Sequence, residues 1–411
     1  MPYSRSRSRY ILLSLWVLMF SSSSQFFIMS PILSQIGLQL DIPEAVRGTL
    51  ISAYAITLGI VALITGPISD RVGRRKILLI GSGAMAISLG LHQFAFDYYS
   101  MLAVRIASGF AGGILTGSCV AYIGDYFPKE RRGWANGVIA TGSAVGQIVA
   151  IPIGTVMAGE FGFHSPFLLF SVVMVMAFFL ILIKVPQPAV QLADCRIAPK
   201  NMISGYLDLL QHKGVRSIAA GYFLMFLSIT VFIVYFPTWL ENEYYKTTYE
   251  IALLFFIGGL ATILTGPLSG KISDRTGRKQ IIIIANLLLA IVMPLALFFL
   301  SLSCSLTYLL FFVIMLLMVA RMVPFQALAS ETLHDKTRGR LMSLTIAIGQ
   351  LGMAMGSAIS GILYTELGFL GNALIGAFAC ILMAYFIGRL ITTPLVAIGE
   401  ESSAAKARAI E

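Results

Sequence analysis

The chain has 411 residues, of which 57% are hydrophobic and only 12% are charged. Soluble globular proteins carry about 25% charged residues, so this composition excludes an ordinary soluble enzyme or binding domain. The net charge of +10 could indicate a nucleic-acid partner, but the basic residues collect in short loops between apolar stretches, which favours membrane orientation instead.

Apolar stretches of about 20 residues recur along the chain, and each is long enough to cross a hydrocarbon core of about 30 Å. Runs such as Val172–Ile183 are apolar throughout, whereas the strands of a membrane β-barrel alternate apolar and polar residues. We therefore predict an all-α integral membrane fold with twelve transmembrane helices. They are expected at residues 10–36, 45–68, 77–96, 100–123, 134–158, 166–184, 216–239, 250–269, 280–302, 306–330, 340–365 and 371–394.

The first of these helices has an alternative interpretation as a secretory signal peptide. Arg5, Arg7 and Arg9 precede an apolar run that ends at Phe20, and small residues follow. The apolar run resumes at Phe26, however, and a retained helix gives the even number of spans that the charge pattern requires. We expect the first helix to be retained.

A polar stretch with several prolines divides the predicted helices into two sets of six. We assign residues 1–184 to an N-terminal six-helix bundle, 185–215 to a linker, 216–398 to a C-terminal six-helix bundle and 399–411 to a tail. The four cysteines, Cys119, Cys195, Cys304 and Cys380, have no metal-binding or disulfide spacing and are expected to be unpaired.

The basic residues predict the orientation in the membrane. All but four of the 29 Lys and Arg residues lie in the N-terminal arm, in alternate loops, in the linker or in the C-terminal segment. Because basic loops stay on the cytoplasmic side, both termini and the linker are expected to be cytoplasmic. The exceptions are Arg47 and Lys246 in the opposite loops, and Arg105 and Arg321 inside predicted spans.

A short basic loop occurs twice, about half a chain apart. Residues Gly66–Arg75 read GPISDRVGRR, and residues Gly270–Lys279 read GKISDRTGRK. The aspartates of the two copies, Asp70 and Asp274, are 204 positions apart, and Pro31 and Pro237 are 206 positions apart. These nearly equal offsets indicate that the two halves repeat in parallel. Parallel repeats of this kind are typical of transporters that alternate access around a site near the bilayer midplane.

These motifs resemble those of the major facilitator superfamily across essentially the whole chain. The two copies of the loop match that family's signature after its second and eighth helices. The segment Asp125–Gly133 resembles its loop after the fourth helix, and Arg105 with Gly109 resembles its Arg-x-x-x-Gly motif. The resemblance is nearest to twelve-helix bacterial drug- and sugar-efflux members of the drug:proton antiporter type. Ile151–Gly154 keeps only part of the antiporters' Gly-Pro-x-x-Gly-Gly element.

We interpret the repeated loops as latches that hold the cytoplasmic side closed. Gly73 and Gly277 permit the positive φ of a tight turn, and Asp70 and Asp274 can cap a neighbouring helix. The resemblance implies that the capped helices are those that start near Arg340 and Trp134. The predicted latch residues are Gly66, Asp70, Arg71, Gly73, Arg74, Arg75, Asp125, Asp274, Arg275, Gly277, Arg278 and Glu331.

Each latch is expected to reach an acid beyond its loop. Arg74 and Arg75 could reach Asp125, and Arg278 and Lys279 could reach Glu331. The alternative is that these charges only set topology. Each loop is also preceded or overlapped by a Thr-Gly-Pro-x-Ser sequence, at Thr65–Ser69 and at Thr265–Ser269. The second copy has four more residues between this sequence and its aspartate, so the two latches are expected to be unequal.

Prolines and buried polar residues point to the gate and the substrate cavity. Pro31 and Pro237 should kink symmetry-related helices near their outer ends and shape the outer gate, or kink them without a special role. Arg321 should lie near the midplane, where it binds solute or, alternatively, bonds helix-end carbonyls. The predicted cavity residues, chosen on the helices that line the cavity in the resembled family and their neighbours, are Ser24, Gln25, Arg105, Gln147, Tyr222, Tyr235, Arg321, Gln326 and Gln350.

The predicted function is secondary active transport of a small solute by alternating access, with proton-coupled efflux as the leading form. A uniporter or importer of a polar or anionic solute is the alternative, because no acid lies deep in a predicted span. A non-transporting membrane receptor is an alternative of another class. No enzyme, ATP-binding or metal motif occurs, so we expect no cofactor besides a proton gradient. The protein is expected to be a monomer in the lipid bilayer of the inner (plasma) membrane.

Overall fold

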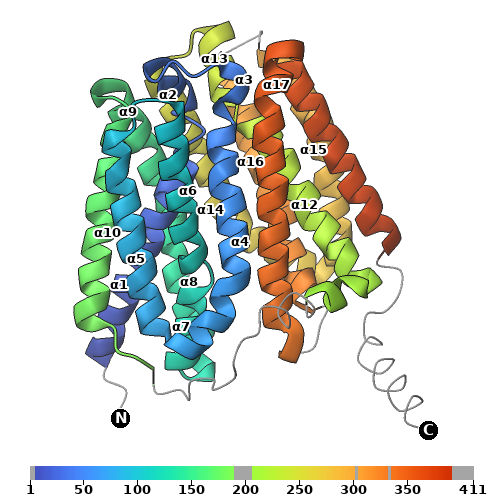
Figure 1. The fold of residues 1–411 in the computed structure, drawn as a ribbon. Coiled ribbons are helices and arrows are strands. Elements are labelled where there is room, and N and C mark those ends of the chain that lie inside the picture. The colour runs from blue at the N-terminus through green and yellow to red at the C-terminus, as the bar shows by residue number, and fades with distance from the viewer. Residues whose placement is uncertain (1–4, 189–205, 301–303, 332–334, 391–411) are drawn as a thin grey trace.

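The computed structural model describes residues 5–188, 206–300, 304–331 and 335–390. Within these ranges the chain is helical apart from short turns (Figure 1). Eleven of the described helices are long and apolar enough to cross a membrane. The predicted all-helical membrane fold is confirmed.

The first half of the chain contains six crossings, several of them interrupted. Its elements are α1 (Arg5–Phe27), α2 (Leu33–Gln39), α3 (Glu44–Arg47), α4 (Thr49–Val72), α5 (Arg74–Leu91), η1 (His92–Phe94), α6 (Tyr98–Leu115), α7 (Ser118–Tyr126), α8 (Lys129–Val145), η2 (Gly146–Ala150), α9 (Ile151–Phe161) and α10 (His164–Lys184).

The second half repeats this arrangement with longer helices. Its elements are α12 (Lys213–Ile233), α13 (Phe236–Tyr244), α14 (Thr248–Thr276), α15 (Arg278–Leu300), α16 (Cys304–Glu331) and α17 (Asp335–Leu390). The 56 residues of α17 are too many for one crossing. Gly368 lies inside α17 with φ 65° and ψ −176°, so the chain reverses there and α17 supplies the last two of twelve crossings.

Four predicted spans are less regular than hydropathy indicated. The first and seventh spans break next to Pro31 and Pro237, between α1 and α2 and between α12 and α13. The fourth span breaks at Gly117, whose φ of +77° favours glycine. The fifth contains a π-helical turn, η2. Hydropathy reports apolar length only, so it does not detect such breaks.

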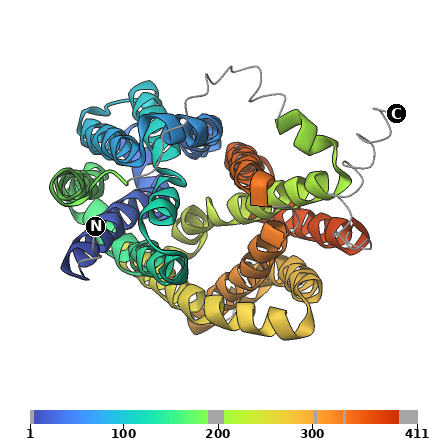
Figure 2. The same cartoon turned by 90° about the horizontal axis from the view of Figure 1, so that it is seen from below.

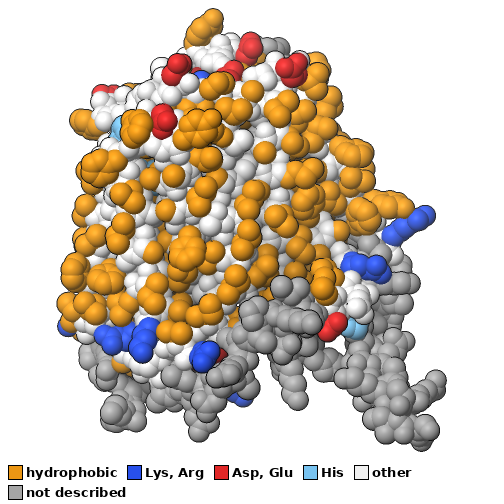
Figure 3. All heavy atoms as spheres, in the orientation of Figure 1, with side chains coloured by type: hydrophobic (Ala, Val, Ile, Leu, Met, Phe, Trp, Pro, Cys, Tyr) orange, Lys and Arg blue, Asp and Glu red, His pale blue; other side chains and the backbone are white. Residues whose placement is uncertain are grey.

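The two bundles lie side by side, and their ends differ in charge. Figure 2 shows the first bundle next to the second, viewed along the helices. In Figure 3 hydrophobic side chains cover the middle of the molecule, most Lys and Arg lie toward one end, and most Asp and Glu lie toward the other. We call these the basic end and the acidic end. The helix α1 begins, and α17 finishes, at the basic end (Figure 1).

Helix starts at the acidic end are capped by side chains. The carboxylate of Asp97 accepts from the backbone N–H of Ser100, and Ser100 Oγ accepts from the backbone N–H of Asp97, which together form a capping box that begins α6. The hydrogen bonds from Ser100 lower the pKa of the Asp97 carboxyl. Thr247 and Glu250 form the same arrangement at the start of α14.

Candidate functional site

The two bundles touch at the acidic end through α4 and α17. Ser52 Oγ donates to the carbonyl of Ala354 at 2.7 Å and shares a 2.8 Å hydrogen bond with Ser357 Oγ. A Cβ placed on Gly48 would overlap the carbonyl oxygen of Ser357. These two helices are therefore in backbone contact where α4 begins.

The same two helices separate toward the basic end. At Gly59, near the middle of α4, an added Cβ would lie 3.1 Å from Cβ of Gln350 and 3.3 Å from the carbonyl oxygen of Ala347. At Gly66, about two turns further, nothing lies within 4 Å of such a Cβ. The spacing between α4 and α17 thus grows along their length.

A second pair follows the same pattern. It consists of α14 and the fifth crossing, which is formed by α8, η2 and α9. A Cβ on Gly159 would lie 2.9 Å from Thr248 Cγ2 at the acidic end, and a Cβ on Gly259 would lie 2.7 Å from Ile148 Cγ1 near the middle. Gly137 and Gly266, toward the basic end, have nothing within 4 Å. Both helix pairs that join the bundles therefore close at the acidic end and open toward the basic end.

The predicted contact between the first loop and Asp125 is present within the first bundle, while the role of this loop as a latch stays a prediction. Arg74 Nε donates to Asp125 Oδ2 at 2.6 Å, and Arg74 Nη1 donates to Ser69 Oγ at 2.9 Å. Arg74 also forms an ion pair with Asp70. Gly73, which ends α4, has φ +101°, so the predicted tight turn is confirmed.

Arg75 does not follow the prediction. Its guanidinium donates to the carbonyl of Leu182 at 2.7 Å, and its backbone N–H donates to Gln187 Oε1 at 3.1 Å. Arg75 therefore ties the loop to the end of α10, while Arg74 alone binds Asp125. Adjacent helical residues point about 100° apart, so one loop cannot direct both guanidinium groups to the same acid.

The second latch differs from the first, as predicted. Gly277 has φ +95°, and Arg278 lies 3.4 Å from Asp274. Lys279 Nζ donates to the carbonyl of Gly388 at 2.7 Å. The side chain of Glu331 lies outside the described residues, so its pairing stays a prediction. Arg71 and Arg275 are both exposed.

No cap from Asp274 to the helix near Trp134 is among the described contacts, and the cap from Asp70 to the start of α17 stays a prediction. Asp70 binds Arg74 and Asp274 binds Arg278, each one turn along its own chain. The side chains at the start of α17 lie outside the described residues. Nothing lies within 4 Å of a Cβ placed on Gly66, toward the basic end of α4.

We expect Asp125→Asn to weaken the loop and slow transport severalfold. The change removes the charge that Arg74 Nε contacts, while the amide keeps the size of the side chain. The ion pair is partly exposed, so folding stability should fall by no more than about 1 kcal/mol. Transport rates in proteoliposomes and thermal unfolding of the purified protein would test this, with Glu130→Gln as the control at an exposed acid nearby. Equal rates for Asp125→Asn and wild type would contradict the latch.

A buried polar cluster occupies the interior of the first bundle. Arg105 Nη1 donates to Gln25 Oε1 at 3.3 Å, and Gln25 Nε2 donates to the hydroxyl of Tyr54 at 3.1 Å. The guanidinium lies over the Tyr54 ring, 4.6 Å from its centroid, and Arg105 Nε donates to the carbonyl of Leu50 at 3.4 Å.

One donor of this cluster has no partner among the described residues. Arg105 is 0% exposed, yet its Nη2 makes no hydrogen bond. Buried polar atoms are nearly always satisfied, so an unsatisfied cationic donor favours a bound anion, a polar solute or water. Arg105 and Gln25 are therefore brought together, as expected of two cavity residues.

Arg321 has a different environment inside the second bundle. Its Nη1 donates to Asn286 Oδ1 at 2.7 Å and lies 3.3 Å from Cys380 Sγ. Its Nη2 donates to Ser228 Oγ at 2.8 Å and to the carbonyl of Met225 at 3.2 Å. The residue is 0% exposed, and its partners come from α12, α15 and α17. Its Nε has no partner among the described residues. In this state the contacts of the other two nitrogens give Arg321 a role in holding the bundle together, and solute binding stays a prediction.

The other predicted cavity residues do not form one cluster. Ser24 Oγ donates to the carbonyl of Phe20 in its own helix. The Tyr222 ring packs on Phe325 within the second bundle. Gln326 is exposed, Gln147 lies in η2, and Gln350 lies beside Gly59 with an unpaired Oε1. Tyr235 is at the acidic end, where its hydroxyl binds backbone groups of the first bundle.

The residues that join the bundles were not predicted from the sequence. Ser30, Gly48, Ser52 and Ser357 are small or weakly polar and stand in apolar runs, where they carry no distinctive pattern. The position of Ser30 directly before Pro31 was the one available signal. Among the described residues no group of three or more His, Cys, Asp or Glu could hold a metal ion.

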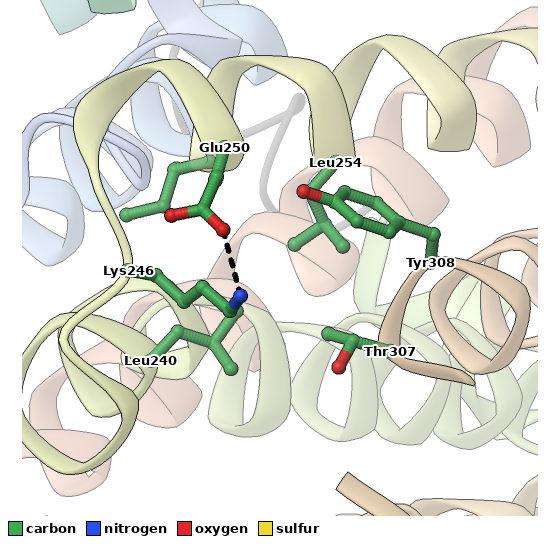
Figure 4. Close-up of a pocket in the computed structure, with 7 residues that line it drawn as sticks. Leu240, Lys246, Glu250, Leu254, Thr307 and Tyr308 are labelled. Carbon is green, nitrogen blue, oxygen red and sulfur yellow. Dashed lines mark hydrogen bonds and ion pairs between the residues drawn. The ribbon is translucent and has the colours of Figure 1, made fainter. Parts of the chain in front are cut away.

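A small hollow at the acidic end is lined by Lys246. Lys246 and Arg47 are the two basic residues in the loops opposite the predicted cytoplasmic side. Lys246 Nζ donates to Glu250 Oε1 at 2.7 Å, as Figure 4 shows. Tyr308 and Thr307 from α16 lie across from them. Arg47 similarly lies 3.7 Å from Glu44. Both cations at the acidic end are thus paired with acids one turn away.

The curated relatives of the chain are transporters. It is 26% identical over 348 residues to the uncharacterized MFS-type transporter YceJ of Bacillus subtilis, covering 84% of this chain and 87% of the relative. It is 24% identical over 408 residues to the multidrug resistance protein MdtG of Dickeya zeae, with 94% of each chain covered. A multi-drug resistance efflux pump PmrA homolog of Lactococcus lactis is 25% identical over 285 residues, covering 66% of this chain and 67% of the relative.

Solved structures show the same fold at low sequence identity. A D-xylose-proton symporter has a TM-score of 0.75 at 20% identity, covering 94% of this chain and 98% of the other. A bacterial homolog of the human lysosomal transporter Spinster, in an inward-facing and unoccupied conformation, has a TM-score of 0.73 at 14% identity, covering 94% and 96%. The family model of the Major Facilitator Superfamily matches residues 15–213 and 218–409. The chain belongs to the major facilitator superfamily and is a multi-pass membrane transporter, not an enzyme.

Proposed function

We propose that the protein exports a small solute by alternating access, coupled to proton entry. The observation that carries the proposal is the divergence of both interbundle helix pairs, closed at Gly48 and Gly159 and open at Gly66 and Gly266. A transporter that alternates between two openings needs an interface that can close at either end. The basic end is the cytoplasmic side by the positive-inside rule, so the state described opens inward.

The names of two relatives support export, and a proton symporter with the same fold supports proton coupling. The names of the MdtG and PmrA relatives describe multidrug resistance and efflux. The D-xylose-proton symporter shows that the same fold supports proton coupling, in that case as symport and not as antiport. We therefore include both export of the solute and its coupling to protons in the proposed function.

The Arg105 cluster favours a solute with an anionic or polar neutral group. The guanidinium, the Gln25 amide and the Tyr54 hydroxyl lie together in a buried site, and the described contacts of Arg105 include no carboxylate. A cation with a free Nη2 attracts an acceptor group and repels a simple polycation. We assign this cluster as the part of the cavity that orients the solute.

A second candidate function, uniport of a polar or anionic solute, rests on the composition of the Arg105 cluster. A proton-coupled transporter usually carries its proton on a titratable group with access to the cavity. The buried cluster instead contains an arginine, a glutamine and a tyrosine. If these are the central polar groups of the pathway, the solute can move down its own gradient without a proton.

The experiment begins with an untargeted solute screen by thermal shift, because binding to the folded state raises the apparent unfolding temperature. Solutes that stabilise the protein are then loaded into proteoliposomes, and their flux is measured with and without an imposed pH gradient. Flux that follows the pH gradient supports proton coupling. Flux that depends on the solute gradient alone supports the uniporter, and no flux of any stabilising solute contradicts both.

We expect Arg105→Ala to reduce transport at least tenfold and to remove stabilisation by the solute. The guanidinium contacts two side chains and the Leu50 carbonyl at once, so Arg105→Lys should not restore activity. Circular dichroism and size-exclusion chromatography would confirm folding. If the folded Arg105→Ala variant keeps wild-type solute affinity, the cluster does not bind the solute.

A further inference from the structure

The break in the seventh crossing supplies an acceptor to the other bundle. Pro237 has no backbone N–H, so the carbonyl of Ile233, four residues earlier, lacks the partner that a continuous helix provides. The Ile233 oxygen instead accepts a 2.8 Å hydrogen bond from Ser30 Oγ. Ser30 belongs to the first bundle and lies in the turn between α1 and α2, next to the symmetry-related Pro31. The helix breaks beside Pro31 and Pro237 are therefore in contact across the interface, joined by the hydrogen bond from Ser30 to the Ile233 carbonyl.

The residue inside the second break also crosses the interface. Tyr235 lies between α12 and α13 and is 0% exposed. Its hydroxyl donates to the backbone carbonyl of Glu44 and accepts a 3.2 Å hydrogen bond from the backbone N–H of Gly48. Gly48 ends α3 and immediately precedes α4, and its N–H is also directed at the Val46 carbonyl within α3. One hydroxyl thus binds two backbone groups of the other bundle.

Charged and polar side chains lie above these bonds at the acidic end. Asn242 Nδ2 donates to Glu44 Oε1 and to the Tyr364 hydroxyl, each at 3.2 Å, and so links α3 to α13 and α17. Glu241 lies beside Ser34 of α2 and within electrostatic reach of Arg47. Arg47 packs its guanidinium against Gly37 and donates to the Ile42 carbonyl. This arrangement gives a role to a basic residue that the orientation rule does not explain.

We propose that Ser30 and Tyr235 hold the gate at the acidic end closed through hydrogen bonds to backbone groups of the opposite bundle. We call these contacts the bolt, and Tyr235 is its central residue. All three bonds involve main-chain groups: the Ile233 carbonyl, which Pro237 deprives of its helical partner, and the Glu44 carbonyl and Gly48 N–H at the two ends of α3. The bolt therefore costs no separate acceptor side chain, and it disengages as a unit when the bundles part. The inference rests on the proposed alternating access and reassigns Tyr235 from the substrate cavity to the gate.

The test measures opening of the acidic end without any solute. Spin labels are attached to Leu38→Cys on α2 and Leu367→Cys on α17, both exposed positions at that end, with Cys195 and Cys304 replaced by Ser. Pulsed electron spin resonance in lipid nanodiscs then gives the populations of short and long distances. Tyr235→Phe and Ser30→Ala should each shift the closed-to-open ratio by about fivefold or more, the effect of one net hydrogen bond. Unchanged distance distributions in both variants would overturn the proposal.

Two matched controls and a double variant separate the bolt from general damage. Ser14→Ala removes a serine that bonds only its own helix, and Tyr385→Phe removes a hydroxyl on an exposed ring, so neither should shift the ratio. Pro237→Ala restores an N–H that can bond the Ile233 carbonyl, so Ser30→Ala should have a smaller effect in that background. Additive effects would show that Ser30 does not act through this carbonyl. Failure of the solute screen would leave these distances unaffected, so the two proposals fail separately.

Discussion

Gly48→Ala should hold the protein open at the acidic end and reduce transport at least tenfold. The added Cβ would overlap the carbonyl oxygen of Ser357 and lie 2.9 Å from its carbonyl carbon. Real Cβ atoms essentially never approach backbone atoms that closely, and the backbone of a packed helix cannot rotate away as a side chain can. The backbone φ of Gly48 is −59°, which alanine adopts readily, so the effect comes from the interface and not from strain in the turn.

Gly66→Ala is the informative partner of this variant. In the present state nothing lies within 4 Å of a Cβ at Gly66, so the change should not disturb it. If the predicted cytoplasmic latch closes in the other state, the same methyl group should hinder that closure and trap the inward-open form. The spin-label distances should then shift in opposite directions for the two variants.

The measurements for this pair are transport in proteoliposomes and the acidic-end distance distribution. Gly83→Ala serves as the control, because its Cβ would make an ordinary 3.4 Å contact with Phe178 inside the first bundle. Wild-type transport in Gly48→Ala would show that the α4–α17 contact is dispensable. The same distribution for Gly48→Ala and Gly66→Ala would contradict the two-ended mechanism.

Arg321→Ala should destabilise the second bundle by roughly 3 kcal/mol or more. The guanidinium satisfies Asn286, Ser228 and the Met225 carbonyl at the same time, and all of these are buried. Removing it leaves several polar groups without partners in the protein interior. Arg321→Lys should recover little stability, because a single ammonium group cannot reproduce a fork that spans three helices.

Thermal unfolding in detergent, followed by tryptophan fluorescence or aggregation, would measure this loss. Arg389→Ala is the control, since Arg389 is an exposed residue near the end of α17 and should cost less than about 1 kcal/mol. If Arg321→Ala unfolds at the wild-type temperature but loses stabilisation by the solute, the residue binds the solute as the sequence first suggested. A lower unfolding temperature with unchanged solute affinity would establish the structural role.

The features predicted correctly from the sequence are those that depend on one segment at a time. Each apolar run must satisfy its own backbone in the hydrocarbon core, so helix type and approximate position can be predicted from hydropathy. The turns at Gly73 and Gly277 are equally local, because a positive φ requires a residue without a Cβ. The contact between Arg74 and Asp125 was predicted because the resemblance placed both loops at one end of the bundle.

The errors concern residues whose role depends on the rotation of a helix about its axis. Arg75 was expected at Asp125 but binds the end of α10. Tyr235 was expected in the cavity because the seventh helix lines it in the resembled family, yet the break beside Pro237 turns its hydroxyl toward Gly48. Arg321 was expected near the midplane, but depth does not say whether a side chain faces the cavity or the bundle interior.

By itself the sequence determined that this is a duplicated, twelve-helix membrane transporter with a basic and an acidic end. Those properties follow from hydropathy, charge and repeats, which act along the chain. Only the tertiary structure decided which end is closed and which atoms close it. The bond from Ser30 to the Ile233 carbonyl joins residues 203 positions apart and uses a main-chain group that every residue possesses. No residue type marks such an acceptor, because it becomes available only when Pro237 breaks the helix and the other bundle brings a donor to it.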